Sequence, residues 1–222
     1  MIEVRQTEQF ERWLDGLTDE RARKSIAQRI ARVQAGLLGD AKFFDGIGEL
    51  RIDHGPGYRL YLVKRGTVLI ILLCGGDKGS QARGHQAGEA DGEGLLRGMI
   101  GKTTIFDAAK YLDDADSQAA LLNDALGSGN PAYVTHALGI VARARGMTAV
   151  AKEAGVTREA LYRALSDDGD PKLSTLLGVV KALGVRLSAT PDETPVATKA
   201  ELSRDRSTRR MRVTSGSKAA NG

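Results

Sequence analysis

The sequence predicts an α+β chain in two parts: a small antiparallel sheet with two helices, followed by an all-α region. Apolar residues recur with a period of two from Leu50 to Val63, as expected for half-buried strands, and residues 68–74 are nearly all apolar. Before and after that stretch they recur with helical spacing, and residues 82–98 show neither period. A length of 222 residues is consistent with two small domains.

A short strand and two helices are predicted at the start of the chain. Residues 2–5 are predicted to be an edge strand, and Thr7 is predicted to begin a helix that includes Phe10. Thr18 is predicted to begin a second helix, with Ile26, Ile30 and Val33 on its apolar face. We interpret the arginine-rich remainder of this helix as a solvated face; an RNA contact is the alternative.

Three strands are predicted to follow. Leu50 and Ile52 lie in the first of them, and "DHGPGY" turns the chain into a second that contains Leu60. "KRG" forms the next hairpin, and residues 68–74 are so apolar that we place them in the centre of the sheet. Two helices would therefore cover one face of an antiparallel sheet.

The stretch "FFDGIGELRIDHGPGYRLYLVKRGTVLIILLCGGDKGSQ" resembles the HigB-like killer toxins of the RelE/ParE superfamily. The resemblance implies a RelE-like fold over residues 1–81. Most of these toxins are ribonucleases that act on mRNA, some on the ribosome, and others in the superfamily poison gyrase. Cleavage of RNA by its own 2′-hydroxyl needs a base, an acid and cations that hold the phosphate, so we expect no metal or other cofactor.

Five residues of this part are candidate catalytic residues: Arg51, His54, Tyr58, Arg59 and Lys78. Arg51 and Arg59 lie on polar faces of neighbouring strands and could clamp a phosphate, or they could pair with Glu49 and Asp53. His54 and Tyr58 flank the "GPG" turn, where His54 is either a proton shuttle or an exposed turn residue. Lys78 follows Gly75 and Gly76, which are themselves candidates for plain turn glycines.

The second part is predicted to consist of successive helices. Ala119, Leu122 and Leu126 form one predicted face, and the helix from Pro131 to Gly146 follows. "MTAVAKEAGVTREALYRALS" then fits a helix-turn-helix, with Gly155 in the turn and Thr157 capping the second helix. Pro171 is predicted to start a last helix, whose inward residues are Leu173, Leu176, Leu177, Val180 and Leu183.

The second helix of that motif supplies the candidate DNA-binding residues Thr157, Arg158, Glu159, Tyr162 and Arg163. Arg158 or Arg163 would read guanine, Glu159 would accept from cytosine, and Thr157 would contact phosphate. A helical hairpin with a solvated face is the alternative interpretation. Net charge is +4 and the isoelectric point about 9.2, which permits a nucleic-acid partner without requiring one.

Residues 103–189 resemble HigA-like addiction-module antidotes of the Cro/repressor class, through "IFDAAKYL", the helix-turn-helix and "PKLSTLLGVVKALGVRLSA". The resemblance implies a Cro-like fold, a toxin as partner, and a homodimer that represses its own promoter at a palindromic operator. We expect this antitoxin domain to span residues 99–189. Residues 190–222 are predicted to be a basic disordered tail.

Residues 82–98 can all be encoded by codons that begin with G or C, as expected when a GC-rich gene is translated out of frame. One permitted codon choice, read one nucleotide later, gives REDIKLAKRMAKDYSEE and a stop that overlaps the codon of Met99. That peptide resembles the C-terminal helix which such toxins carry after "GGDKGSQ" and which is missing here. We interpret the segment as a frameshift scar; an ordinary flexible Gly-rich linker is the alternative.

Together these features predict a toxin that is inactive or neutralised, tethered to a DNA-binding antitoxin. One alternative is an active mRNA endoribonuclease with a built-in regulatory domain, and another is a plain repressor with a non-catalytic fused domain. "MIEVRQTEQF" lacks the apolar region of a signal peptide and no run reaches transmembrane length, so we expect a cytoplasmic protein with no membrane contact.

Overall fold

The computed structural model describes residues 1–44, 47–66, 69–77, 103–166 and 168–191. Residues 1–186 form one compact unit, and residues 187–191, the described part of the other unit, contain no helix or strand. No helix in these described ranges is long and apolar enough to cross a bilayer. The expected α+β class is confirmed.

Six described strands form one sheet in the order β2-β3-β4-β5-β1-β6. Their bounds are β1 Glu3–Thr7, β2 Lys42–Phe44, β3 Ile47–Ile52, β4 Tyr58–Arg65, β5 Leu69–Asp77 and β6 Thr103–Ile105. The prediction of a purely antiparallel sheet is wrong, because β1 and β5 pair in parallel. The long connection from β1 through two helices and three strands permits this pairing.

Two expectations about strands also need correction. β1 is not an edge strand, because β6, which comes from the second part of the chain, pairs with it. β2 was not predicted, since three residues are too few to reveal a period of two. β5 lies between β4 and β1, so its predicted central position is confirmed.

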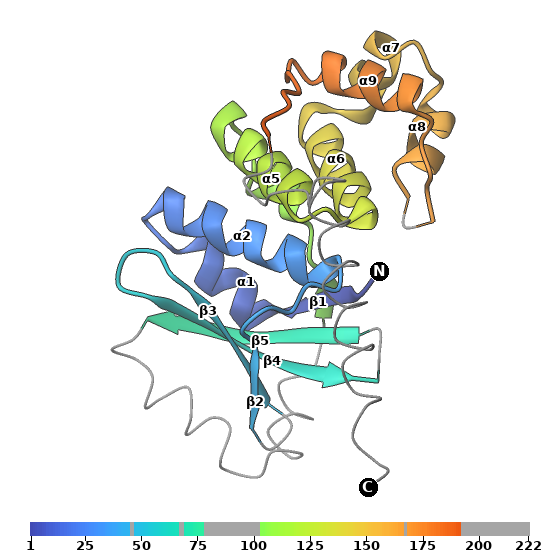
Figure 1. The fold of residues 1–222 in the computed structure, drawn as a ribbon. Helices are drawn as coiled ribbons and strands as arrows, with labels where there is room; N and C mark the ends of the chain where they lie inside the picture. The colour runs from blue at the N-terminus through green and yellow to red at the C-terminus, as the bar shows by residue number, and fades with distance from the viewer. Residues whose placement is uncertain (45–46, 67–68, 78–102, 167, 192–222) are drawn as a thin grey trace, which may run out of the picture. The chain divides into compact units, whose positions relative to one another are not determined.

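Helices α1 (Glu8–Asp15) and α2 (Glu20–Gln34) cover one face of the sheet (Figure 1). The Thr7 hydroxyl accepts a hydrogen bond from the Phe10 N–H and caps α1 as predicted. Asp19, and not Thr18, caps α2 through the Ala22 N–H. The predicted apolar face of α2 is fully buried, and it consists of Ile26, Ile30 and Val33.

Gly75 lies within β5, so its interpretation as a turn glycine is wrong. The Trp13 ring of α1 packs directly on it, and a Cβ at this position would lie 2.1 Å from a ring carbon. Only glycine leaves space for the indole there.

The helical region contains a 3₁₀ turn and five α-helices within the described residues. They are η2 Ala108–Lys110, α5 Ala115–Gly127, α6 Pro131–Arg145, α7 Met147–Glu153, α8 Arg158–Ala164 and α9 Leu173–Ala182. The predicted helix starts at Pro131 and Arg158 are confirmed, and Gly146 ends α6 with a φ of +91°. The last helix begins at Leu173, two residues after the predicted Pro171.

Two predicted apolar faces differ from the observed ones. On α5 the buried apolar residues are Leu121, Leu122 and Ala125, while Leu126 is 43% exposed. On α9, Val180 and Leu183 are buried as predicted, but Leu173 and Leu177 are 70% and 49% exposed. Helical spacing alone leaves the direction of such a face uncertain by about one residue, because 3.6 residues make a turn.

Candidate functional sites

Arg51 and Arg59 face each other across strands β3 and β4. Two like charges in this position repel each other, and Glu49 offsets the repulsion. Its Oε1 atom accepts hydrogen bonds from Arg51 Nε at 2.8 Å and from an Arg59 terminal nitrogen at 2.6 Å. The Glu49 side chain is 4% exposed, whereas that of Arg51 is 46% exposed. The alternative pairing with Glu49 is thus present in the structure, whereas within the described residues neither arginine pairs with Asp53.

Tyr58 and His54 lie on the other side of the sheet from this arginine pair. Tyr58 neighbours Arg59 in β4, so its side chain points to the opposite face, where its ring packs edge-on against Trp13 at 6.3 Å. His54 Nε2 lies 3.3 Å from an Asp19 carboxylate oxygen at the start of α2. The hydrogen bond from the Ala22 N–H, together with His54, lowers the pKa of Asp19.

The four described candidate catalytic residues therefore do not form a single site. The sheet brings Arg51 and Arg59 together and directs Tyr58 away from them. Lys78 lies outside the described residues. What the arginine pair can do chemically is hold an anion at the exposed Arg51, because Arg59 is largely occupied by Glu49.

A second cluster of contacts, which the sequence did not reveal, joins the second part of the chain to the edge of β1. Thr103, Thr104 and Ile105 pair antiparallel with Thr7, Gln6 and Arg5. The Arg5 guanidinium donates to the Thr103 hydroxyl and to its carbonyl, both at 2.8 Å. "TTIF", a β-branched run before an aromatic, is the sequence signal for this strand.

Phe106 is the apolar centre of this contact. It is 1% exposed, its ring meets Phe10 edge-on at 6.3 Å, and Tyr111 stacks on it at 5.7 Å. Its backbone N–H donates to the Val4 carbonyl, and its carbonyl accepts from the Gln34 amide at 3.0 Å. The ring therefore belongs to the same hydrophobic core as the helices over the sheet.

Polar contacts surround Phe106 on the side of α1. Asp15 accepts hydrogen bonds from Lys110 Nζ and from the Tyr111 hydroxyl, each at 2.9 Å, and Lys110 also reaches Glu11. Burial acts to raise the pKa of Asp15, but the two hydrogen bonds outweigh it and lower that pKa. Burial and the Asp15 carboxylate raise the pKa of Tyr111 to about 12.

Charged side chains of helix α2 form ion pairs with acidic residues of α5 and of its N-terminal cap. Lys24 Nζ lies 2.6 Å from an Asp114 oxygen, and this contact lowers the Asp114 pKa strongly. Arg32 pairs with Asp124, which also accepts the Tyr133 hydroxyl at 2.7 Å.

His136 of α6 also contacts α2, where its Nε2 atom lies 3.1 Å from the Gln34 side-chain oxygen. Burial, helped by the nearby charge of Arg143, lowers the pKa of this imidazole to about 4.

Helices α7 and α8 form the predicted helix–turn–helix arrangement. Gly155 in the turn has a φ of +71°, which favours glycine, and Thr157 Oγ1 accepts from the Ala160 N–H at 3.1 Å. Leu161 of α8 is buried. The five candidate DNA-binding residues are all exposed, and they are Thr157, Arg158, Glu159, Tyr162 and Arg163.

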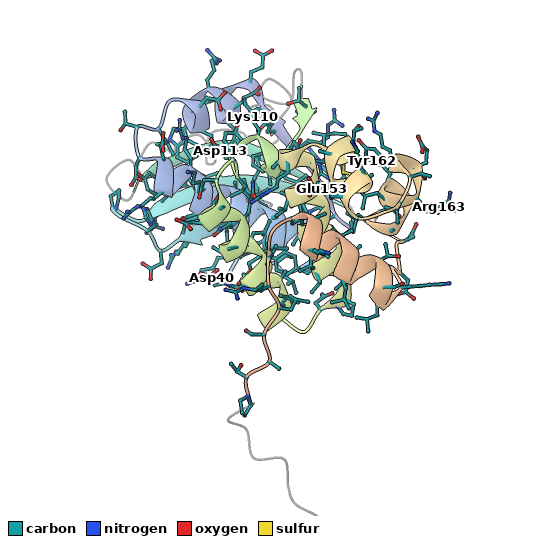
Figure 2. The ribbon with its side chains drawn as sticks, turned by 90° about the horizontal axis from the view of Figure 1, so that it is seen from above. Asp40, Lys110, Asp113, Glu153, Tyr162 and Arg163 are labelled. Atoms are coloured by element: carbon teal, nitrogen blue, oxygen red, sulfur yellow. The ribbon has the colours of Figure 1, made fainter. Side chains whose placement is uncertain are left out.

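Arg158 and Tyr162 contact each other on the exposed face of α8. The guanidinium lies 5.4 Å from the centre of the Tyr162 ring, and Arg158 donates to the Tyr162 hydroxyl at 3.5 Å. That hydrogen bond raises the pKa of Arg158. Figure 2 shows Tyr162 and Arg163 pointing away from the helix bundle. This face offers cations, an acceptor and an aromatic ring to an external ligand.

By its fold the chain is an α+β protein in which a sheet of mixed direction is joined to a helical region that contains a helix–turn–helix. A family model described as "Probable addiction module antidote protein" matches residues 102–191. Residues 102–191, which make up less than half of the chain, are therefore similar to the addiction-module antidote family. The match supports an antitoxin function, and an antitoxin implies a toxin as its partner.

Two proteins of Haemophilus influenzae, both described as uncharacterised, are similar to this chain. One is 52% identical over 81 residues, which make up 36% of this chain and 82% of the relative. The other is 41% identical over 81 residues, or 36% of this chain and 84% of the relative. No solved structure matches the chain.

Proposed function

We propose that the chain holds a toxin and its antitoxin in one polypeptide, with a RelE-like toxin in residues 1–81 and a Cro-like antitoxin in residues 99–189. The family match covers the second part. The observation that carries the proposal is the contact between the parts, since residues 103–106 complete the sheet and cover part of α1. An antidote is expected to bind its toxin over such a combined apolar and charged surface.

The toxin half is neutralised or impaired as a ribonuclease in this proposal. RNA cleavage needs a base and an acid beside the cations that hold the phosphate. Arg51 and Arg59 share one carboxylate with each other, and Tyr58 points to the opposite face of the sheet. A phosphate would have to compete with Glu49 for both guanidinium groups. The ribosome or mRNA is the partner that such a toxin would attack.

An active mRNA endoribonuclease with a built-in regulatory domain is the second candidate. The observation in its favour is that Arg51 remains 46% exposed. In addition, the polar contacts described above between the two parts involve β1, α1 and α2. An antitoxin seated there would leave the arginine pair uncovered.

The antitoxin half binds operator DNA through α8 in this proposal, as a homodimer on a palindrome at its own promoter. Arg158 and Arg163 would read guanine in the major groove, with Glu159 as an acceptor for cytosine. Their exposure supports this role. Thr157 is committed to the helix cap through its hydroxyl, so a phosphate contact would come from its neighbouring backbone.

Residues 82–98 arose, in this proposal, when a change of one base joined a toxin gene to the antitoxin gene downstream. The nucleotide sequence across residues 80–102 tests this directly. We expect the shifted frame to encode an amphipathic helix that stops at the codon of Met99. A shifted frame with no coherent helix would leave an ordinary linker as the explanation.

A growth assay on induction of the whole chain tests the proposed function. We expect no growth arrest; arrest would favour the active endoribonuclease. A variant with Lys24→Glu and Arg32→Glu reverses two charges that pair with Asp114 and Asp124 and should loosen the antitoxin half. If this variant arrests growth and the wild-type chain does not, the antitoxin half neutralises an active toxin half. If neither arrests growth, the toxin half is itself impaired as a ribonuclease. Arg21→Glu is the matched control, because Arg21 is exposed on the same helix.

A further inference from the structure

The outer edge of β1 has the properties of a site that accepts an extended strand. β1 pairs with β5 on one side, and β6 occupies its other side over three residues. Without β6 this edge would present unpaired backbone N–H and C=O groups, which readily pair with another strand. Arg5 adds specificity to this edge, because its guanidinium donates two hydrogen bonds to the residue at position 103, here Thr103.

We propose that the β1 edge and the adjoining Phe106 pocket form a peptide-acceptor site that binds residues 103–111 of a second copy of this chain when its own segment is displaced. The proposal rests on the proposed function only for its consequence, that an antitoxin supplied by another chain can reach the toxin half. The acceptor site itself is defined by β1, Phe10, Asp15 and Gln34.

One aromatic side chain dominates the recognition of the segment. Phe106 is 1% exposed, whereas Ile105 before it is 62% exposed. The ring fills a space bounded by Phe10, and Tyr111 closes it from the same segment. Burying a phenyl group contributes more free energy than a single hydrogen bond in the strand.

Charged groups at the end of the segment fix its register. Lys110 and Tyr111 both bind the Asp15 carboxylate, and the Gln34 amide donates to the Phe106 carbonyl. Strand pairing, an aromatic anchor and a terminal ion pair together define a motif that a short peptide can carry. The peptide KTTIFDAAKYL, residues 102–112, contains all of it.

Residues 103–111 are covalently attached to their own acceptor site, and this determines when two copies can exchange them. The chain's own segment has an effective concentration near the millimolar range, so it outcompetes a free peptide as long as its anchor is intact. Weakening that anchor in one chain leaves the acceptor in place and open to the same segment from another. This is the situation in which identical elements are exchanged between protomers.

Binding of the fluorescently labelled peptide KTTIFDAAKYL to the full-length chain tests the proposal by anisotropy. We expect the Phe106→Ala chain to bind it at least ten-fold more tightly than the wild-type chain does. A peptide with alanine at the phenylalanine position, and an Arg5→Ala substitution added to the Phe106→Ala chain, should each lose that gain. Equal binding of the two peptides would overturn the proposal, as would failure of a folded Phe106→Ala chain to bind.

Circular dichroism establishes whether the Phe106→Ala chain is folded. If it is not, Thr104→Pro displaces the segment by removing a strand N–H while it keeps the apolar core, and the same comparison applies. The binding assay involves neither growth nor nucleic acid. A negative result therefore rejects the acceptor site alone, and growth arrest by the whole chain would reject the proposed function alone.

Discussion

The helical region carries two surfaces of opposite character. On the surface built from β6, η2, α5 and α6, the polar side chains find partners in the first part of the chain: Lys110 meets Asp15, Asp114 meets Lys24, and His136 meets Gln34. On α8, by contrast, Arg158 contacts Tyr162 of the same helix. We call the first the occupied surface, because the first part of the chain packs against it. We call the second, on α8, the open surface, because its charged side chains are exposed to solvent.

The largest effect is expected where the occupied surface is most buried. Phe106→Ala should reduce the free energy of unfolding by about 3 to 4 kcal/mol, because it removes a fully buried phenyl group and leaves a cavity beside Phe10. Urea unfolding measures the change. Ile105→Ala, at a residue that is 62% exposed, should cost under about 1 kcal/mol and serves as the control. A similar loss for both variants would mean that Phe106 does not anchor the segment.

Acid should weaken the occupied surface through His136. The pKa of its imidazole is about 4 in the folded chain and near 6.5 when unfolded, so the unfolded chain binds more protons between these values. The free energy of unfolding should therefore fall as the pH drops from 6.5 towards 4, by about 3 kcal/mol. Burial is the main cause, and Arg143 adds to it.

The His136→Gln variant provides the control for this pH dependence. Glutamine stays neutral and keeps a polar group beside Gln34, so most of the slope between pH 6.5 and 4 should disappear in urea unfolding curves. An unchanged slope would assign the acid sensitivity to other groups.

The open surface should respond in DNA binding rather than in stability. Arg158→Ala should weaken binding to DNA from the chain's own promoter about ten-fold, since a good arginine–guanine pair is worth about 1 to 3 kcal/mol. A gel shift measures this, and Lys181→Ala, an exposed charge on α9, is the matched control. Unchanged binding by Arg158→Ala would reject α8 as the recognition helix.

The smallest effect is expected at the rim of the occupied surface. Lys110 is 48% exposed and pairs with Asp15 and Glu11. Exposed ion pairs add little, so Lys110→Ala should change the free energy of unfolding by under about 1 kcal/mol. A loss as large as that of Phe106→Ala would show that the rim, and not the aromatic ring, holds the segment.

Sequence reasoning found the features that depend on local chemistry. The helix–turn–helix was predictable because Gly155, the Thr157 cap and buried Leu161 each leave a signal within a few residues. The strands around Arg51 and Arg59 were predictable for the same reason, since their period of two is local.

The occupied surface depends on pairing between distant segments and left only weak signals. A three-residue strand at Thr103–Ile105 gains its stability from β1, about a hundred residues away. The parallel pairing of β1 with β5 is equally non-local. The side chains of Tyr58 and Arg59 lie on opposite faces of β4. Which of these faces the helices cover is decided by long-range packing, so it could not be predicted from the strand itself.

Engineered cysteines test most directly whether residues 103–105 complete the sheet. Cysteines placed by Arg5→Cys and Ile105→Cys would face each other across β1 and β6, where a disulfide can form. We expect this pair to form a disulfide readily on mild oxidation of the full chain, and a Glu3→Cys and Ile105→Cys pair to do so far less. Equal or absent disulfide formation in the two double variants would contradict this pairing of β1 with β6.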